Sequence, residues 1–83
     1  MTGMRTTGSS VTFRSPFRLK GFKAPEPPGV YAVETDEEVI EGNDRTTYVR
    51  VATLLYIEAG GTIRTVTVDP ADLQAALERD VAP

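Results

Sequence analysis

Two turn signals that flank a strongly β-forming stretch constrain the fold of this chain more than any other feature. Gly42-Asn43-Asp44 precedes the stretch Thr46–Ile57, and Gly60-Gly61 follows it. Asn, Asp and Gly tolerate the left-handed backbone conformations that tight hairpin turns need. The sequence therefore predicts a strand over Thr46–Ile57 that lies between two antiparallel neighbours, Val30–Glu41 and Thr62–Asp69.

The two turn lengths also predict a register. A three-residue turn at 42–44 places Asp36 opposite Arg50, and a two-residue turn at 60–61 places Leu55 opposite Val66. A slip of one residue would set the apolar side chains of one strand beside the acidic side chains of the next. The predicted core face contains Tyr31, Val33, Thr35, Val39, Val49, Val51, Thr53, Leu55, Ile57, Val66 and Val68.

An earlier stretch, Val11–Lys20, alternates apolar and polar residues and predicts the first strand. Pro16 lacks a backbone donor, so this strand belongs at an edge or bends there. The proline-rich segment 21–29 predicts a loop, and the Thr/Gly/Ser-rich residues 1–10 predict a disordered leader. If the first strand pairs with the second, three of its cations face three carboxylates within the chain. The cations are Arg14, Arg18 and Lys20, and the carboxylates are Glu34, Asp36 and Glu38.

The C-terminal segment has the signature of a helix start. Asp69 suits the N-cap, Pro70 the first helical position and Asp72 the first turn. An apolar stripe follows, formed by Leu73, Ala76, Leu77 and Val81. The sequence thus predicts an α+β fold for a single small domain over residues 11–83. It is a four-stranded antiparallel β-meander with one C-terminal helix packed on the apolar sheet face.

The residue types limit the available chemistry. The 83 residues include no Cys, His or Trp, which excludes disulfides, Cys/His metal sites and His-based acid–base catalysis. Only the carboxylates Glu34, Asp36 and Glu38 remain for catalysis, and we expect them to form a solvated, ion-paired face instead. The acidic run 36–44 lacks the spacing of a calcium loop. We therefore expect no enzyme activity, no metal and no cofactor.

The net charge and the hydropathy of the chain argue against two classes of binding partner, nucleic acids and membranes. The net charge is −3, and this argues against a dedicated nucleic-acid binder. Basic residues do interleave with Phe13, Phe17 and Phe22, but strand alternation points phenylalanines into the core. The longest mostly apolar run, Val51–Ile57, is too short to span a bilayer. We expect a cytoplasmic protein that binds neither nucleic acid nor membrane.

A candidate contact surface lies on the predicted outer sheet face. Its residues are Tyr48, Arg50, Leu54 and Tyr56 on the third strand, with Glu34 and Asp36 beside them. Tyrosine and arginine are frequent interface anchors. The leading hypothesis is a non-catalytic protein-interaction or self-associating module with a protein partner or a homodimer. The last strand, Thr62–Val68, is a second candidate contact. The alternative is a small-ligand or nucleic-acid binding module with a half-open SH3-like barrel.

Several segments also carry a resemblance. They are Ser15–Leu19, Pro27–Tyr31, Val33–Glu38, Ile40–Gly42 and Tyr48–Leu55. Together they are similar to segments of a group of short, uncharacterised bacterial proteins, over a stretch from Phe13 to Asp80. The resemblance implies a free-standing bacterial cytoplasmic domain, and it implies no activity, substrate, cofactor or functional residue.

Overall fold

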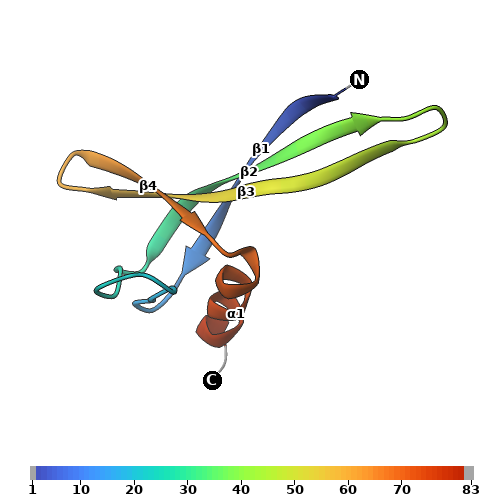
Figure 1. Cartoon of the computed structure of the whole chain (residues 1–83). Coiled ribbons are helices and arrows are strands. Elements are labelled where there is room, and N and C mark those ends of the chain that lie inside the picture. Colours follow the sequence, from blue (N-terminus) through green and yellow to red (C-terminus); the bar gives the residue numbers. More distant parts are fainter. Residues whose placement is uncertain (1, 82–83) are drawn as a thin grey trace.

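Four antiparallel strands and one C-terminal helix make up residues 2–81, the part of the chain that the computed structural model describes (Figure 1). The elements are β1 (Thr2–Phe13), β2 (Gly29–Glu41), β3 (Thr46–Ala59), β4 (Thr62–Val68) and α1 (Pro70–Val81). The strands form one open sheet in the order β1-β2-β3-β4. The α+β fold class and the meander order are therefore confirmed.

The turn between β3 and β4 has the predicted length. Gly60 (φ 58°) and Gly61 (φ 80°) both adopt the left-handed conformation that a two-residue hairpin turn requires. Ala59 pairs with Thr62 across this turn, and Leu55 pairs with Val66 further along. The predicted register of this hairpin is confirmed.

The hairpin of β2 and β3 differs from the prediction. Its turn has four residues, 42–45, closed by a 2.8 Å hydrogen bond from the Gly42 N–H to the Arg45 carbonyl. The register then shifts again, so that Ala52 lies opposite Asp36 and Arg50 opposite Glu37, with Val51 bulged between them. The predicted pairing of Asp36 with Arg50 is therefore wrong.

The same bulge corrects part of the predicted core face. Val49 and Val51 are 44% and 58% exposed, whereas Thr53, Leu55 and Ile57 are buried as predicted. Burial selects one register only where one face of a sheet is covered. The end of this hairpin is exposed on both faces, so its apolar pattern does not determine the register.

The first strand begins earlier and ends earlier than predicted. Residues 2–10, expected to be disordered, form most of β1, which pairs with β2 from Thr2–Ile40 to Phe13–Gly29. Apart from Met4 and two glycines these residues are polar, and the pairing is made by the backbone against the edge of β2. Residues 14–28 form a loop, in which Phe17 and Glu26 exchange backbone hydrogen bonds of 3.0 and 2.8 Å.

This change of register removes the predicted cross-strand ion pairs. Arg14, Arg18 and Lys20 lie in the loop 14–28, and the residues opposite the acidic row are uncharged. Those residues are Gly8 opposite Glu34, Thr6 opposite Asp36 and Met4 opposite Glu38.

The helix covers one end of the sheet. The Asp69 carboxylate accepts a 2.9 Å hydrogen bond from the Ala71 N–H, which confirms the predicted N-cap. Leu73 and Ala76 are buried in the core, and Leu77 is partly buried and packs against the core; the side chain of Val81 lies outside the described part of the chain. The rest of the core is Phe13, Phe17, Leu19, Tyr31, Val33, Leu55, Ile57 and Val68, and the rings of Phe13 and Phe17 stack at 3.7 Å.

The other end of the sheet projects away from the helix (Figure 1). We call residues 2–7 and 36–52 the arm; it comprises the start of β1, the end of β2, the following turn and the start of β3. The radius of gyration is 15.2 Å, against about 12 Å for a compact domain of this length. The arm gives the molecule extents of 47 × 32 × 20 Å.

Candidate functional site

The arm exposes apolar side chains that a monomeric domain normally buries. Five of the seven large hydrophobic residues exposed in the described chain lie on it. They are Met4 (63% exposed), Ile40 (39%), Tyr48 (48%), Val49 (44%) and Val51 (58%). All described side chains of its β1 segment, and those of residues 46–51, are exposed. This concentration makes the arm the strongest candidate for a contact surface.

One face of the arm is a continuation of the core face. Arg5, Glu37 and Arg50 form one cross-strand row on it, and Tyr48 lies in the next row. The Arg5 guanidinium donates to the Glu37 carboxylate from Nε at 3.1 Å and from a terminal nitrogen at 2.5 Å, and this hydrogen bonding raises the pKa of Arg5. The same guanidinium lies 4.0 Å from the centre of the Tyr48 ring. These contacts hold an arginine and a tyrosine in fixed positions on an exposed surface.

The opposite face carries the acidic row Glu34, Asp36 and Glu38 of β2. The Thr6 hydroxyl donates to the Asp36 carboxylate at 2.8 Å. The nearby Glu34 carboxylate raises the pKa of Tyr56, because its interaction with the phenol favours the protonated form. Met4 and Val49 flank Glu38 in the next row, so acidic and apolar groups alternate along this face.

The bulge at Val51 divides the predicted contact surface between these two faces. Tyr48 and Arg50 lie on the core-side face of the arm. The four others, Glu34, Asp36, Leu54 and Tyr56, lie on the opposite face, where Leu54 pairs with Glu34. The prediction that Tyr48, Arg50, Leu54 and Tyr56 share one face is therefore wrong. A bulged residue advances the alternation by one position, and every side chain beyond it changes face.

Sequence reasoning missed Met4, Arg5 and Thr6, because residues 1–10 were interpreted as a leader. The available signal was weak. Thr6 and Thr7 favour strands, but the flanking Gly3, Gly8 and serines do not. The β2 residues that pair with Met4, Arg5 and Thr6 are Glu38, Glu37 and Asp36, thirty or more residues away in the chain.

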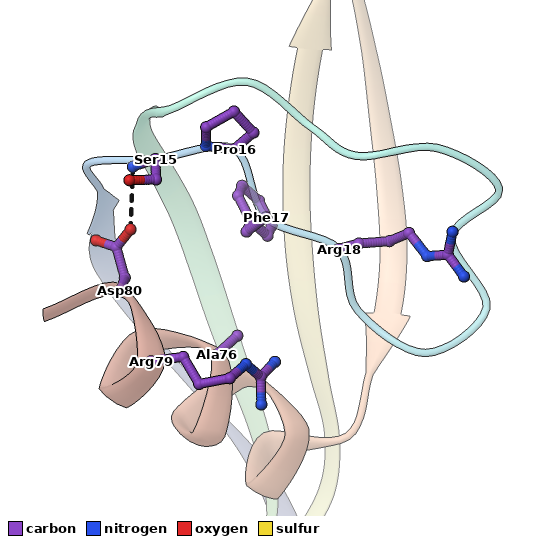
Figure 2. A pocket seen from close by; sticks show the side chains of 7 residues that line it. All are labelled: Ser15, Pro16, Phe17, Arg18, Ala76, Arg79 and Asp80. Carbon is purple, nitrogen blue, oxygen red and sulfur yellow. Dashed lines mark hydrogen bonds between the residues drawn. The ribbon is translucent and has the colours of Figure 1, made fainter. Parts of the chain in front are cut away.

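Three hollows are alternative candidate sites. The first, of about 290 Å³, lies between the loop and the helix and is lined by Ser15, Pro16, Phe17, Arg18, Ala76, Arg79 and Asp80 (Figure 2). The Asp80 carboxylate accepts hydrogen bonds from the backbone N–H groups of Arg14 (2.8 Å) and Ser15 (3.0 Å), so it is engaged in holding the loop. Figure 2 shows Arg18 pointing away from the helix. The hollow lies just below the usual size of a ligand pocket.

The second hollow, of about 430 Å³, contains Glu26 and Arg64, which form an ion pair at 2.8 Å. The third, of about 500 Å³, lies on the sheet face opposite the helix, where β2 and β3 separate beyond the Val33–Leu55 pair. Its lining includes the exposed Val30 and Ile63 beside Tyr56. The second and third hollows have the volume of a ligand pocket, but all three are open to solvent and none encloses a ligand.

Within residues 2–81, no three acidic, histidine or cysteine side chains converge in a way that could hold a metal ion. The helix in this part of the chain is too short and too polar to cross a membrane. Comparisons with protein-family models, curated proteins and solved structures found no match for the chain.

Proposed function

We propose that this protein is a non-catalytic protein-interaction module and that the arm is its contact surface. The exposed apolar side chains of the arm carry the proposal. Keeping them in water forgoes on the order of 25 cal/mol for each Å² of apolar area that a partner could cover. Exposed apolar patches of this kind on folded proteins mark interaction sites.

The composition of the arm supports the same function. Interface cores are enriched in tyrosine, methionine and arginine, and their energetic anchors are often tyrosine and arginine. The arm presents Tyr48, Met4 and Arg5, and Arg5 is already oriented by Glu37 and Tyr48. A preordered side chain loses less conformational freedom on binding than a mobile one. Arg50 makes no ion pair within residues 2–81, so its charge is available to a partner.

A double variant of the arm tests this proposal. Met4→Lys with Val49→Lys replaces two exposed apolar side chains that flank Glu38 in the register, so the added charges have a carboxylate between them. The control is Ile63→Lys, which changes an apolar residue of β4 that lies outside the arm and is at least as exposed as Met4 and Val49. Circular dichroism of each variant checks that the fold is kept.

Two measurements are needed, because the partner is another protein or a second copy. Sedimentation of the purified chain reports self-association, and quantitative affinity capture from native lysate reports other proteins. We expect the wild type and Ile63→Lys to retain a stoichiometric partner and the double arm variant to lose it. A double variant that retains every partner, or a wild type that binds nothing in either assay, would refute the proposal.

One observation favours a second candidate function, the binding of an acidic ligand. The loop 14–28 exposes four cations, Arg14, Arg18, Lys20 and Lys23. Phe13 and Phe17 beside them are buried, so their rings are not accessible for stacking on bases. Capture of nucleic acid that is lost on Arg18→Glu with Lys20→Glu, but not on the arm variant, would favour this function over the first.

A further inference from the structure

The outer edge of β1 is a long, unprotected strand edge. Within residues 2–81, β1 pairs only with β2, so the backbone groups along its other side have no strand partner. Natural edge strands are usually blunted by shortness, proline, bulges or several charges. β1 is twelve residues long, has no proline and no shift in its register, and carries one charge, Arg5, which is paired with Glu37. Such an edge is suited to the addition of another strand.

We infer that the partner of the arm is a second copy of this chain, and that the two copies pair β1 against β1 in antiparallel orientation. This inference rests on the proposed function and names the partner. The pairing joins two four-stranded sheets into one continuous sheet of eight strands. Each copy presents the same edge to the other, so the contact closes at two copies, whereas β1 against β4 would leave open ends.

The symmetry of this pairing fixes its geometry. Two identical antiparallel strands are related by a two-fold axis perpendicular to the sheet, so each residue pairs with one on the same face. Both helices therefore lie on the same side of the joined sheet. Residues at the middle of β1, Thr6 to Ser9, lie near the axis and approach their own counterparts.

Charge distribution favours a second copy over an unrelated strand. The two ends of the β1 edge differ in charge, because the arm carries five acidic and three basic residues, and the loop 14–28 carries four basic and one acidic. Only Arg5–Glu37 and Arg64–Glu26 are paired in the described chain. Antiparallel pairing sets the acidic arm of each copy next to the basic loop that follows β1 of the other. The acidic end of the β1 edge in one copy therefore lies next to the basic end in the other, so the two edges are electrostatically complementary.

Sedimentation across a range of concentrations is the first test. We expect the wild type to reach twice its 9.0 kDa chain mass. Raising the salt from about 0.1 M to about 1 M shortens the Debye length from about 10 Å to about 3 Å, so we expect the dissociation constant to rise several-fold. Arg18→Glu with Lys20→Glu, both exposed and unpaired, should raise it at low salt and reduce its salt dependence.

Cysteine cross-linking locates the contact, since the chain contains no natural cysteine. Single substitutions Thr6→Cys, Thr7→Cys, Gly8→Cys and Ser9→Cys scan the proposed axis, and mild oxidation should join two chains at one or two of these positions. A Cβ added at Gly8 meets no atom within 4 Å, so that variant keeps the fold. The matched control is Thr65→Cys, an exposed residue in the middle of the β4 edge, which should remain a monomer on a non-reducing gel.

The outcomes separate this inference from the proposed function. Cross-linking at Thr65 but not along β1 would overturn the β1 pairing, as would a wild type that stays monomeric at every concentration. In the monomeric case, a heterologous protein that is captured by the wild type and lost from Met4→Lys with Val49→Lys would leave the proposed function standing. A wild type that neither self-associates nor captures another protein would refute the two together.

Discussion

The bulge at Val51 divides the arm into two faces and leaves the Val51 side chain exposed. A charged substitution at Val51 tests that exposure directly. Val51→Asp places a carboxylate on the bulged residue of β3, which is 58% exposed. The matched variant is Val33→Asp, the same change on the neighbouring strand at a residue that is 5% exposed. The register predicted from the turns alone would place both valines in the core.

The two expected costs differ several-fold. Full burial of a valine side chain contributes about 1.5–3 kcal/mol, and less than half of Val51 is buried. With a small loss of strand propensity, Val51→Asp should lower the free energy of unfolding by about 1 kcal/mol. Val33→Asp buries an unpaired carboxylate, which costs several kcal/mol. Since a domain of this size has about 3–5 kcal/mol of stability, that variant should not fold.

Urea denaturation followed by far-ultraviolet circular dichroism measures both variants, at one protein concentration because the chain is proposed to self-associate. We expect Val51→Asp to give a cooperative transition at a modestly lower urea concentration and Val33→Asp to lack a folded baseline. If Val51→Asp is as destabilising as Val33→Asp, the bulge is absent in solution and the division of the arm into two faces is wrong.

Two further predictions concern side chains near the base of the arm. The Thr53 hydroxyl is buried and has no hydrogen-bond partner in the described chain. Thr53→Val removes this hydroxyl without changing the shape of the side chain, so it should raise the free energy of unfolding by about 1 kcal/mol and the melting temperature by about 4–8 °C. An unchanged or lower melting temperature would contradict this prediction. Glu34→Gln should lower the pKa of Tyr56 toward the ordinary value of about 10. Because that pKa is raised in the folded chain, its stabilisation is present below the ordinary tyrosine pKa and disappears as the pH rises through the raised one. Tyrosinate absorbance during an alkaline titration measures this shift, and identical curves for the variant and the wild type would exclude the Glu34 contact.

The parts of the fold that were predicted correctly depend on local chemistry or on burial. Asp69 and Pro70 mark the helix start through groups within one turn of each other. Gly60 and Gly61 suit the two-residue turn because both residues have positive φ. Leu55 and Val66 pair as expected, since they lie where the helix and the loop cover the sheet.

The candidate site was predicted only in part, and one feature of β3 explains the part that failed. Tyr48 and Arg50 were recognised as exposed anchors, and both are exposed. Their grouping with Leu54 and Tyr56 failed because it assumed an unbroken alternation along β3, and Val51 interrupts it. A single bulged residue leaves no clear mark in the apolar pattern when both faces of the strands are in water.

The sequence by itself determined β2, β3, β4 and the helix, the order of the strands and the core face beneath the helix, because these follow from turn chemistry, capping and the burial of one apolar face. Only the tertiary structure decided that residues 2–10 form a strand and that the arm has two differently charged faces. The physical reason is that both depend on backbone hydrogen bonds to a distant strand. Those bonds are nearly indifferent to side-chain type, so the residues that make them do not reveal their partner.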